Sequence, residues 1–245
     1  TPMNAIIGIL ELALKRADSD RIERSSIEIA YSSAKSLLEL IGDILDIARI
    51  ESGRLSLSPK RANLRELVES VARVFEGLAR QKCLSLILEI DSSINGDVLV
   101  DGMRFKQILS NLVSNAIKFT EAGFIKVSIS GELVENAVLR VELSVEDSGI
   151  GISPSNQQRL FQPFAQVERN VQNIEGTGLG LVICRSLCEM MGGQVSMSST
   201  LGHGTRVDVA LRLQVLERTA TSERPPQVKR RYTHRLQILV VDDHP

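Results

Sequence analysis

Three short motifs, rich in amides and glycine, follow one another in this chain and constrain its fold more than any other feature. They are Asn111-Leu-Val-Ser-Asn115-Ala-Ile-Lys118, then Asp147-Ser-Gly149-Ile-Gly151, then Gly176-Thr-Gly178-Leu-Gly180. Each alone is a weak signal, because short glycine-rich stretches often occur by chance. Together they supply amide and amine ligands, a carboxylate and two pliable backbone segments, which an ATP site needs. The alternative is a set of ordinary loops beside a polar helix face.

The first motif places three polar side chains on one face of a helix. Asn111, Asn115 and Lys118 recur at i, i+4 and i+7. Asparagine carbonyl oxygens are suitable ligands for Mg²⁺, and Lys118 can act as a point charge on phosphates. The opposite face carries the apolar residues Ile108, Leu109, Leu112, Val113 and Ala116. A solvated polar face is the alternative interpretation.

The second motif follows a strand-like run of alternating residues. The carboxylate of Asp147 can accept a hydrogen bond from an amine such as the adenine N6 group. Gly149 and Gly151 would let the backbone approach a planar base closely, the alternative being a simple turn at the end of a strand. In the later turn Gly202-His203-Gly204-Thr205, Thr205 can support Asp147 or the base, and His203 is interpreted as an exposed turn residue.

The third motif lies where a loop becomes a helix. The N–H groups at the start of a helix favour phosphate, so Gly176, Gly178 and Gly180 are candidate phosphate-binding residues. These glycines also permit movement of residues 152–175, a candidate lid over the nucleotide. Phe161 and Phe164 lie inside that segment, as a packing anchor or as a docking surface.

The rest of the chain passes from a helical to a mixed pattern. Residues 2–16 and about 20–52 read as helices, and the second has the four-and-three spacing of a helical bundle at Ile27, Tyr31, Ala34, Leu38, Ile41, Leu45 and Ala48. We expect a second copy to complete a four-helix bundle; a hairpin packed on its own domain is the alternative. Helices are expected near 64–80, 102–118 and 178–191, and strands near 84–90, 97–100, 123–130, 137–145, 193–199 and 204–212. This pattern predicts an α+β sandwich.

Composition narrows the classes of function. The net charge is −1, which gives no indication of a nucleic-acid or anionic-membrane surface. The three cysteines lack paired metal-ligand spacing, so we interpret Cys184 and Cys188 as buried free thiols. No run of 18 apolar residues is present. The chain starts without Met, and we expect it to be part of a longer protein.

The motifs resemble the N, G1, F and G2 boxes of sensor histidine kinases, in the family's order and over residues 1 to about 213. The F box corresponds to Phe161-Gln-Pro-Phe164. The segment from Thr1 to Gly8 resembles the tail of the family's H box, and Ile238-Leu-Val-Val-Asp242-Asp243 resembles the first strand of a receiver domain. The chain is therefore similar to hybrid kinases, and its first helix resembles that of virulence sensors of the BvgS and EvgS type.

The resemblance implies an α+β fold in which an antiparallel helical hairpin, half of a dimeric four-helix bundle, precedes a Bergerat-type α/β sandwich. The expected parts are the hairpin at 1–55, the ATP-binding domain at 56–215, a linker at 216–235 and the start of a receiver at 236–245. ATP would phosphorylate a hairpin histidine, and the phosphoryl group would pass to a receiver aspartate and on to a response regulator. The expected partners are a second copy, the protein's own receiver and that regulator, with no nucleic acid. The expected location is the cytoplasmic portion of a bacterial inner-membrane sensor, without direct membrane contact by this chain.

The resemblance also assigns roles by residue. Asn111 and Asn115 would hold Mg²⁺, Lys118 the phosphates and Asp147 the adenine, while the glycine motifs shape the lid. Asp242 and Asp243 resemble the acidic Mg²⁺ pair of a receiver, whose phosphoacceptor would lie beyond Pro245.

One departure from the family concerns the acceptor histidine. It would lie four residues before Thr1, outside this chain, and Thr1 corresponds to the residue that orients water for phosphatase activity. Three rival interpretations follow. One is an ATP-binding dimerisation module acting mainly as a phosphatase or scaffold, and another is a docking module with a degenerate pocket. The third is a different Bergerat-type ATPase that couples hydrolysis to a clamp.

Overall fold

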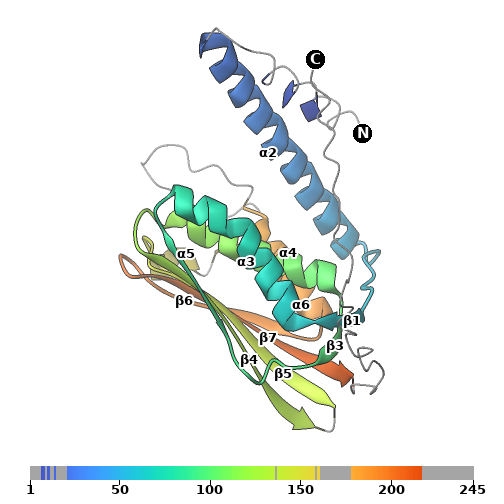
Figure 1. Cartoon of the computed structure of the whole chain (residues 1–245). Coiled ribbons are helices and arrows are strands. Elements are labelled where there is room, and N and C mark those ends of the chain that lie inside the picture. Colours follow the sequence, from blue (N-terminus) through green and yellow to red (C-terminus); the bar gives the residue numbers. More distant parts are fainter. Residues whose placement is uncertain are drawn as a thin grey trace, which may run out of the picture.

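A long helix, α2 (Arg21–Glu51), leads into a sheet that is covered on one face by three helices (Figure 1). In this computed structural model the described residues are 7–8, 10–11, 14, 21–135, 137–157, 159–160 and 178–216. The described residues before α2 are helical, and the Tyr31 hydroxyl of α2 donates a hydrogen bond to the Glu11 carboxylate at 3.0 Å. Two helices therefore lie side by side, as the expected hairpin requires.

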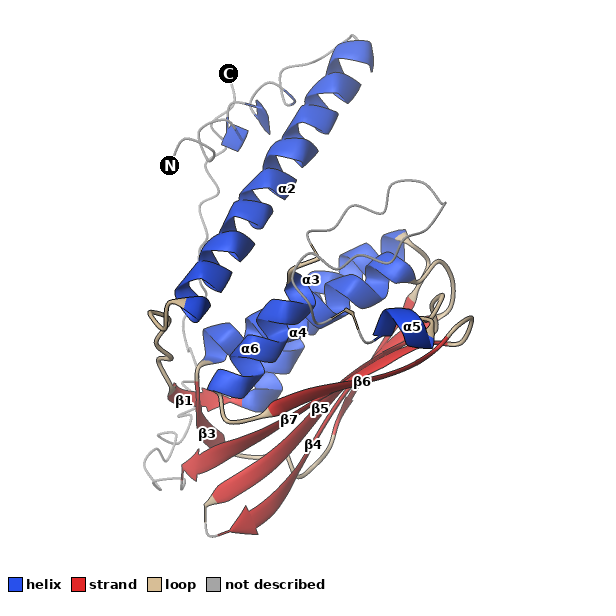
Figure 2. Ribbon diagram, turned by 180° about the vertical axis from the view of Figure 1, so that it is seen from behind, coloured by secondary structure: helices blue, strands red, loops and turns tan. Residues whose placement is uncertain are grey.

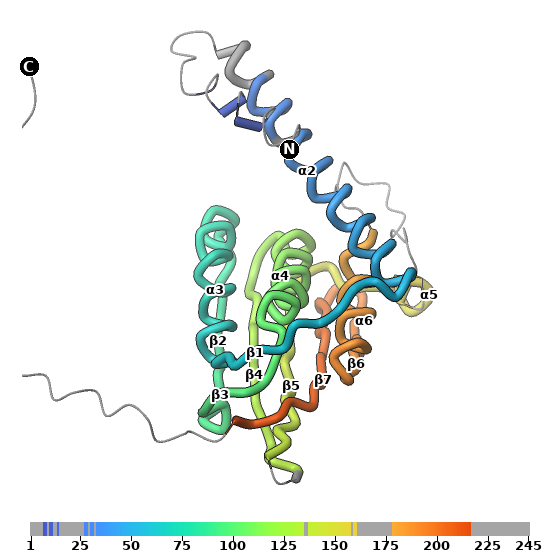
Figure 3. The backbone as a smooth tube through the Cα atoms, turned by 90° about the vertical axis from the view of Figure 1, so that its right-hand side faces the viewer, coloured from blue at the N-terminus to red at the C-terminus, as the bar shows by residue number. Residues whose placement is uncertain are grey.

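Part of the predicted apolar seam of α2 is open to solvent in a single chain. Ile41 is 40% exposed and Leu45 is 52% exposed. The end of α2 lies beside the layer of helices (Figure 3), and its Ile47 and Ile50 pack against the hydrophobic core. The middle and the last turns of α2 thus have different surroundings. The last turns contact the rest of the chain, while the middle presents exposed apolar side chains. Among the described residues, no helix is long and apolar enough to cross a membrane.

The helices α3 (Leu64–Gln81), α4 (Gly102–Phe119) and α6 (Gly180–Met190) form one layer and the sheet forms the other (Figure 2). Side chains cap two of the helices at their starts, because the first N–H groups of a helix have no partner within it. Asn63 accepts from Glu66 N, and Asp101 accepts from the N–H groups of Met103 and Arg104. The apolar face of α4 predicted from the sequence is buried in the core.

The sheet has seven strands in the order β1-β3-β7-β5-β4-β2, with β6 paired to β7. They are β1 (Lys60–Asn63), β2 (Ser85–Ile90), β3 (Asp97–Val100), β4 (Phe124–Glu135), β5 (Val138–Asp147), β6 (Gln194–Thr200) and β7 (Gly204–Leu216). Among the described strands, β2 and β4 are the one parallel pair of neighbours. The first part of β7 pairs with β6 and its last residues pair with β3, so these two strands share one edge of β7, while β5 pairs along the other edge.

The inner face of the sheet supplies one side of the core. Because side chains alternate between the faces of a strand, Ile125, Val127 and Ile129 of β4 all point to the helices and are at most 1% exposed. From residue 21 onward, the cores of the expected helices and strands are found where the sequence predicted them, and most of the helix expected at 2–16 lies outside the described residues. Two short elements were not predicted, β1 and the single-turn helix α5 (Pro154–Gln157). Strand β1 has the sequence Lys-Arg-Ala-Asn, whose polar residues carry no alternating signal, and it is held by pairing with β3 alone.

Candidate nucleotide site

The carboxylate of Asp147 is fixed at the end of β5 by backbone groups from two other segments. Its Oδ1 atom accepts hydrogen bonds from Gly149 N at 2.9 Å and from Thr205 N at 3.3 Å. Burial raises the pKa of this carboxyl, the two N–H donors oppose that rise, and the neighbouring Glu146 charge adds to it. Both donors use Oδ1, so Oδ2 can accept a hydrogen bond from a ligand. Among the predicted site residues this is the most firmly held side chain.

The glycines around Asp147 are required by the crowding of the backbone. A Cβ on Gly149 would lie 2.4 Å from Phe119 O, and one on Gly151 would lie 2.0 Å from Thr200 O. A Cβ on Gly204 would lie 1.8 Å from Asp147 O itself. Gly151 and Gly204 also have positive φ angles, +64° and +99°, which side chains other than glycine rarely adopt. We predicted these glycines of the second motif to allow close approach of a base, and the atoms that approach them here belong to neighbouring chain segments.

A residue that sequence reasoning missed, Ser199, ties this end of the site together. Its Oγ accepts from Ile152 N at 2.8 Å, donates to Gly204 O at 2.9 Å and lies 2.9 Å from Thr205 Oγ1. Thr205 was expected to support Asp147, and it does so through its backbone N–H, while its hydroxyl contacts Ser199. Ser199 lies in a run of serines and threonine in β6, so nothing in the sequence singles it out.

The first and third motifs meet between α4 and α6. Asn111 Nδ2 donates to Gly180 O at 3.4 Å, and a Cβ on Gly180 would lie 3.8 Å from the Asn111 amide. Asn115 and Lys118 follow Asn111 along the same face of α4, and all three are half-buried. The Lys118 ammonium also lies 5.0 Å from the centre of the Phe119 ring. The amide nitrogen of Asn111 is therefore used within the protein, and its oxygen is the atom suited to a cation.

Helix α6 begins immediately after a glycine in a left-handed conformation. Gly178 has a φ of +70°, and no side chain caps the helix that starts at Gly180. Such a helix start directs N–H groups and a partial positive charge outward, which suits a phosphate. The structure thus brings Asn111 and the Gly178–Gly180 segment to one place.

Several predicted residues lie outside the described part of the chain. They are Thr1, Gly176, Asp242 and Asp243, together with Phe161 and Phe164, most of the 216–235 linker and the expected receiver start. Their roles stay predictions from the sequence. The two cysteines of α6 are described, and both are buried free thiols as predicted. Burial raises the pKa of the Cys184 thiol, and it raises that of Cys188 to about 12.

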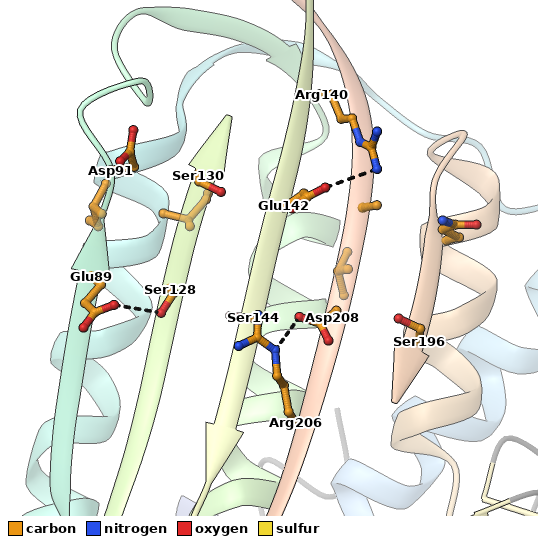
Figure 4. Close-up of a pocket in the computed structure, with 15 residues that line it drawn as sticks. Glu89, Asp91, Ser128, Ser130, Arg140, Glu142, Ser144, Ser196, Arg206 and Asp208 are labelled. Carbon is orange, nitrogen blue, oxygen red and sulfur yellow. Dashed lines mark hydrogen bonds and ion pairs between the residues drawn. The ribbon is translucent and has the colours of Figure 1, made fainter. Parts of the chain in front are cut away.

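A hollow lies on the outer face of the sheet, the face that the helices do not cover (Figure 4). It has a volume of about 700 Å³ and contains none of the predicted site residues. Small serines such as Ser128, Ser144 and Ser196 form its floor. The charged side chains at its rim already pair with one another, as Arg140 does with Glu142 at 3.2 Å and Arg206 with Asp208 at 2.8 Å. Its two guanidinium groups are engaged in these pairs and its surface is open to solvent, so it lacks the converging polar groups of a ligand site.

Comparison with known families matches both parts of the molecule. Residues 100–215 match the "Histidine kinase-, DNA gyrase B-, and HSP90-like ATPase" family, and residues 1–53 match the "His Kinase A (phospho-acceptor) domain". The ATPase match includes all the described residues of the candidate site. The phospho-acceptor match corresponds to the hairpin region.

Comparison with individual related proteins supports the same family. The whole chain is 49% identical to the virulence sensor protein BvgS of Bordetella bronchiseptica and 36% identical to the sensor protein EvgS of Escherichia coli K12, and it spans 20% of the length of each. The solved structure of full-length ShkA in complex with AMPPNP matches with a TM-score of 0.71 at 30% identity, covering 88% of this chain and 44% of that one. With the two family matches, these likenesses show that the chain belongs to the two-component sensor histidine kinases, of which it carries the ATPase domain and the hairpin of the phospho-acceptor domain.

Proposed function

We propose that the ATP-binding part holds the adenine of ATP at Asp147. The supporting observation is the geometry of that carboxylate, whose Oδ1 is occupied by two backbone N–H groups while Oδ2 can accept from the adenine amine. Gly149, Gly151 and Thr205 act by fixing Asp147 and the segments around it. The buried hydroxyl of Thr120, just after α4, has no hydrogen-bond partner among the described residues, and a bound ligand or water would satisfy it.

At the other end of the site, Asn111 and Asn115 are the proposed Mg²⁺ ligands and Lys118 the proposed phosphate contact. Among the described residues no three His, Cys, Asp or Glu side chains gather as a metal site. Amide oxygens beside nucleotide phosphates are a suitable donor set for Mg²⁺, which keeps several oxygens of water and phosphate in its shell. Bound there, Mg²⁺ would neutralise charge on the phosphates. Gly178 and Gly180, with Gly176 before them, are proposed to face the phosphates at the start of α6.

The whole protein is proposed to transfer the γ-phosphoryl group of ATP to a histidine of the hairpin, four residues before Thr1. The histidine nitrogen would attack the γ-phosphorus while the bond to the leaving ADP oxygen breaks, a reaction that depends on positioning and charge stabilisation. The hydrogen bond between Tyr31 and Glu11 sets which residues of the two hairpin helices lie side by side. We propose that, in a continuous first helix antiparallel to α2, that histidine would lie level with about Leu45. Leu45 lines a cleft that also contains Asn111.

The remaining assignments concern partners and location. The exposed seam residues Ile41 and Leu45 support a homodimer through the hairpin, because a second copy would cover them. Onward transfer is proposed to a receiver aspartate beyond Pro245, with Asp242 and Asp243 as its Mg²⁺ pair, and then to a response regulator. The chain spans about a fifth of its curated relatives. We propose that it is the cytoplasmic portion of a membrane-anchored bacterial sensor.

The test uses this chain extended upstream by its natural residues, the histidine included. Incubation with γ-labelled ATP and Mg²⁺ should give an acid-labile, alkali-stable phosphoprotein. Changing the restored histidine to glutamine should remove the label while ATP binding persists. ATP binding without label would favour a module that acts mainly as a phosphatase or scaffold. Absence of ATP binding would contradict the nucleotide site itself.

A further inference from the structure

The last turns of α2 are fastened to the first turns of α4 by a shielded polar network. Asp46 Oδ2 accepts hydrogen bonds from Arg104 at 3.0 Å and from Gln107 at 2.8 Å. Arg104 also donates to the Gln107 amide oxygen at 2.7 Å, so the three side chains satisfy one another. We call Asp46, Arg104 and Gln107 the latch.

The latch differs from the other ion pairs of the described residues in its burial. The side chains of Arg104 and Asp46 are each 17% exposed. Each of the other pairs includes a side chain that is at least 49% exposed. Exposed pairs contribute little because solvent screens them, whereas a shielded pair that loses one partner leaves a poorly solvated charge. The latch is therefore a shielded polar contact able to hold the hairpin against the ATP-binding part.

The latch shares a helix face with the proposed Mg²⁺ ligand. Arg104, Gln107 and Asn111 lie at i, i+3 and i+7 on α4, on the side that faces α2. Between this face and α2 is a cleft of about 410 Å³. Its wall on the α2 side carries three carboxylates and one guanidinium, and the cleft is lined by Glu39, Gly42, Asp43, Leu45, Asp46, Arg49, Gln107 and Asn111.

In this arrangement, docking of the hairpin opposes the binding of a nucleotide. Phosphates held near Asn111 would bring several negative charges toward the carboxylate of Glu39 across the cleft, and like charges repel. We propose that the latch holds the ATP-binding part docked on α2 in a state that binds nucleotide weakly, so that ATP binding and release of the latch are coupled. The inference rests on the proposed nucleotide site. By linkage, closure of the latch weakens ATP binding by the same factor as bound ATP weakens closure of the latch, so a variant that opens the latch should bind ATP more tightly.

A second contact keeps the two parts joined when the latch opens. The buried Asp101, which caps α4, also accepts a hydrogen bond from Ser58 N at 2.8 Å. Ser58 belongs to the connection between α2 and β1, so this connection is fixed to the start of α4 independently of Asp46. Opening the latch would let α2 turn about the residues between Glu51 and Ser58.

The experiment measures the affinity of this chain for ATP with Mg²⁺ by calorimetry. Arg104→Met should tighten binding, by about five- to thirtyfold, and Asp46→Asn should act in the same direction. The charge-swapped double variant, Asp46→Arg with Arg104→Asp, should return the affinity to within about twofold of the unaltered chain, since it rebuilds the pair. An acidic residue in the first turn of α4 also suits the helix dipole, so the swap should leave the helix intact.

The matched control is Arg73→Met, the same change in an exposed pair of α3 in which Arg73 lies 3.8 Å from Glu69. It should leave the affinity unchanged. Unaltered or weaker ATP binding in both single variants would overturn the latch, as would tighter binding that the charge swap fails to reverse. If the unaltered chain binds no ATP, the proposed nucleotide site fails instead, so the two failures can be told apart.

Discussion

The two ends of the proposed nucleotide site are built from different parts of the molecule. At the adenine end, Asp147 is held by backbone N–H groups, and the surrounding glycines are packed against backbone atoms at distances that exclude a Cβ. At the phosphate end, the groups are side chains of one helix face, and the hydrogen bond from Asn111 to Gly180 is long, at 3.4 Å. One end is fixed by the fold, and the other depends on side chains that can rearrange.

This difference indicates how the work of the site is divided. A carboxylate held in place before the ligand arrives selects a base without further ordering, because its entropy has already been lost on folding. The phosphate end faces α2 across the cleft, so it is the end through which the hairpin can sense whether nucleotide is bound. We therefore expect changes at the adenine end to alter stability and base selection, and changes at the phosphate end to alter coupling and transfer.

The largest effect is expected from Gly204→Ala. The new Cβ would lie 1.8 Å from Asp147 O at a residue with a φ of +99°, so the β5–β7 pairing must open beside the adenine end. The free energy of unfolding should fall by about 3 kcal/mol or more in urea titrations. Gly192→Ala is the matched control, since Gly192 has a φ of +72° with open space around it, and should cost about 1 kcal/mol. Equal losses in the two variants would show that the crowding at Gly204 is relieved easily.

The next largest effect concerns the choice of base. ITP carries a carbonyl where ATP has its amine, so the unaltered chain should bind ATP about 10- to 100-fold more tightly than ITP. In Asp147→Asn the side-chain oxygen must still accept from Gly149 N and Thr205 N, which turns the amide nitrogen toward the ligand. This variant should lose ATP affinity and prefer ITP. Competition against a fluorescent nucleotide measures both affinities, and an unchanged preference for ATP would contradict the role of Asp147.

Several features of the fold and of the site could be predicted from the sequence. The apolar face of α4, the Asp101 cap and the alternation in β4, β5 and β7 were predictable, because each follows from residues close together in the chain. The positions of Asp147 at the end of a strand and of Asn111 on one face of a helix followed from the same periodicity. Strand β1 was missed because its pairing partner β3 lies more than thirty residues away and its own residues are polar.

Contacts between distant segments were not predictable. The Asp46–Arg104 contact joins residues 58 positions apart, and Ser199 acts through Ile152, Gly204 and Thr205. A serine or an arginine on a helix or strand has the same local pattern whether it faces solvent or a partner. The crowding at Gly149 was likewise hidden, because the carbonyl that approaches it belongs to Phe119. Such contacts depend on how the layers are stacked.

A smaller effect is expected at the phosphate end. Asn115→Ala should weaken binding of ATP with Mg²⁺ by roughly tenfold, because one proposed amide ligand is lost while Asn111 and Lys118 remain. Adenosine, which lacks phosphates, should bind this variant as well as it binds the unaltered chain. Ser114→Ala, at an exposed neighbouring position of α4, serves as the control. A parallel loss of adenosine affinity would mean that the two ends of the site are not separable.

The smallest effect is a dependence of adenosine binding on pH. The folded state raises the pKa of Asp147 through burial, so this carboxyl takes up a proton at a higher pH than an ordinary aspartate with its value of 3.8. A protonated carboxyl accepts poorly from the adenine amine, so adenosine affinity should begin to fall, by about a fewfold, above the usual aspartate range as the pH is lowered. The free energy of unfolding should change in the opposite direction and rise as the pH is lowered. Burying the charged form of Asp147 costs free energy, and protonation through the raised pKa removes that cost. In Asp147→Asn both trends should vanish, and persistence of either would assign it to another group.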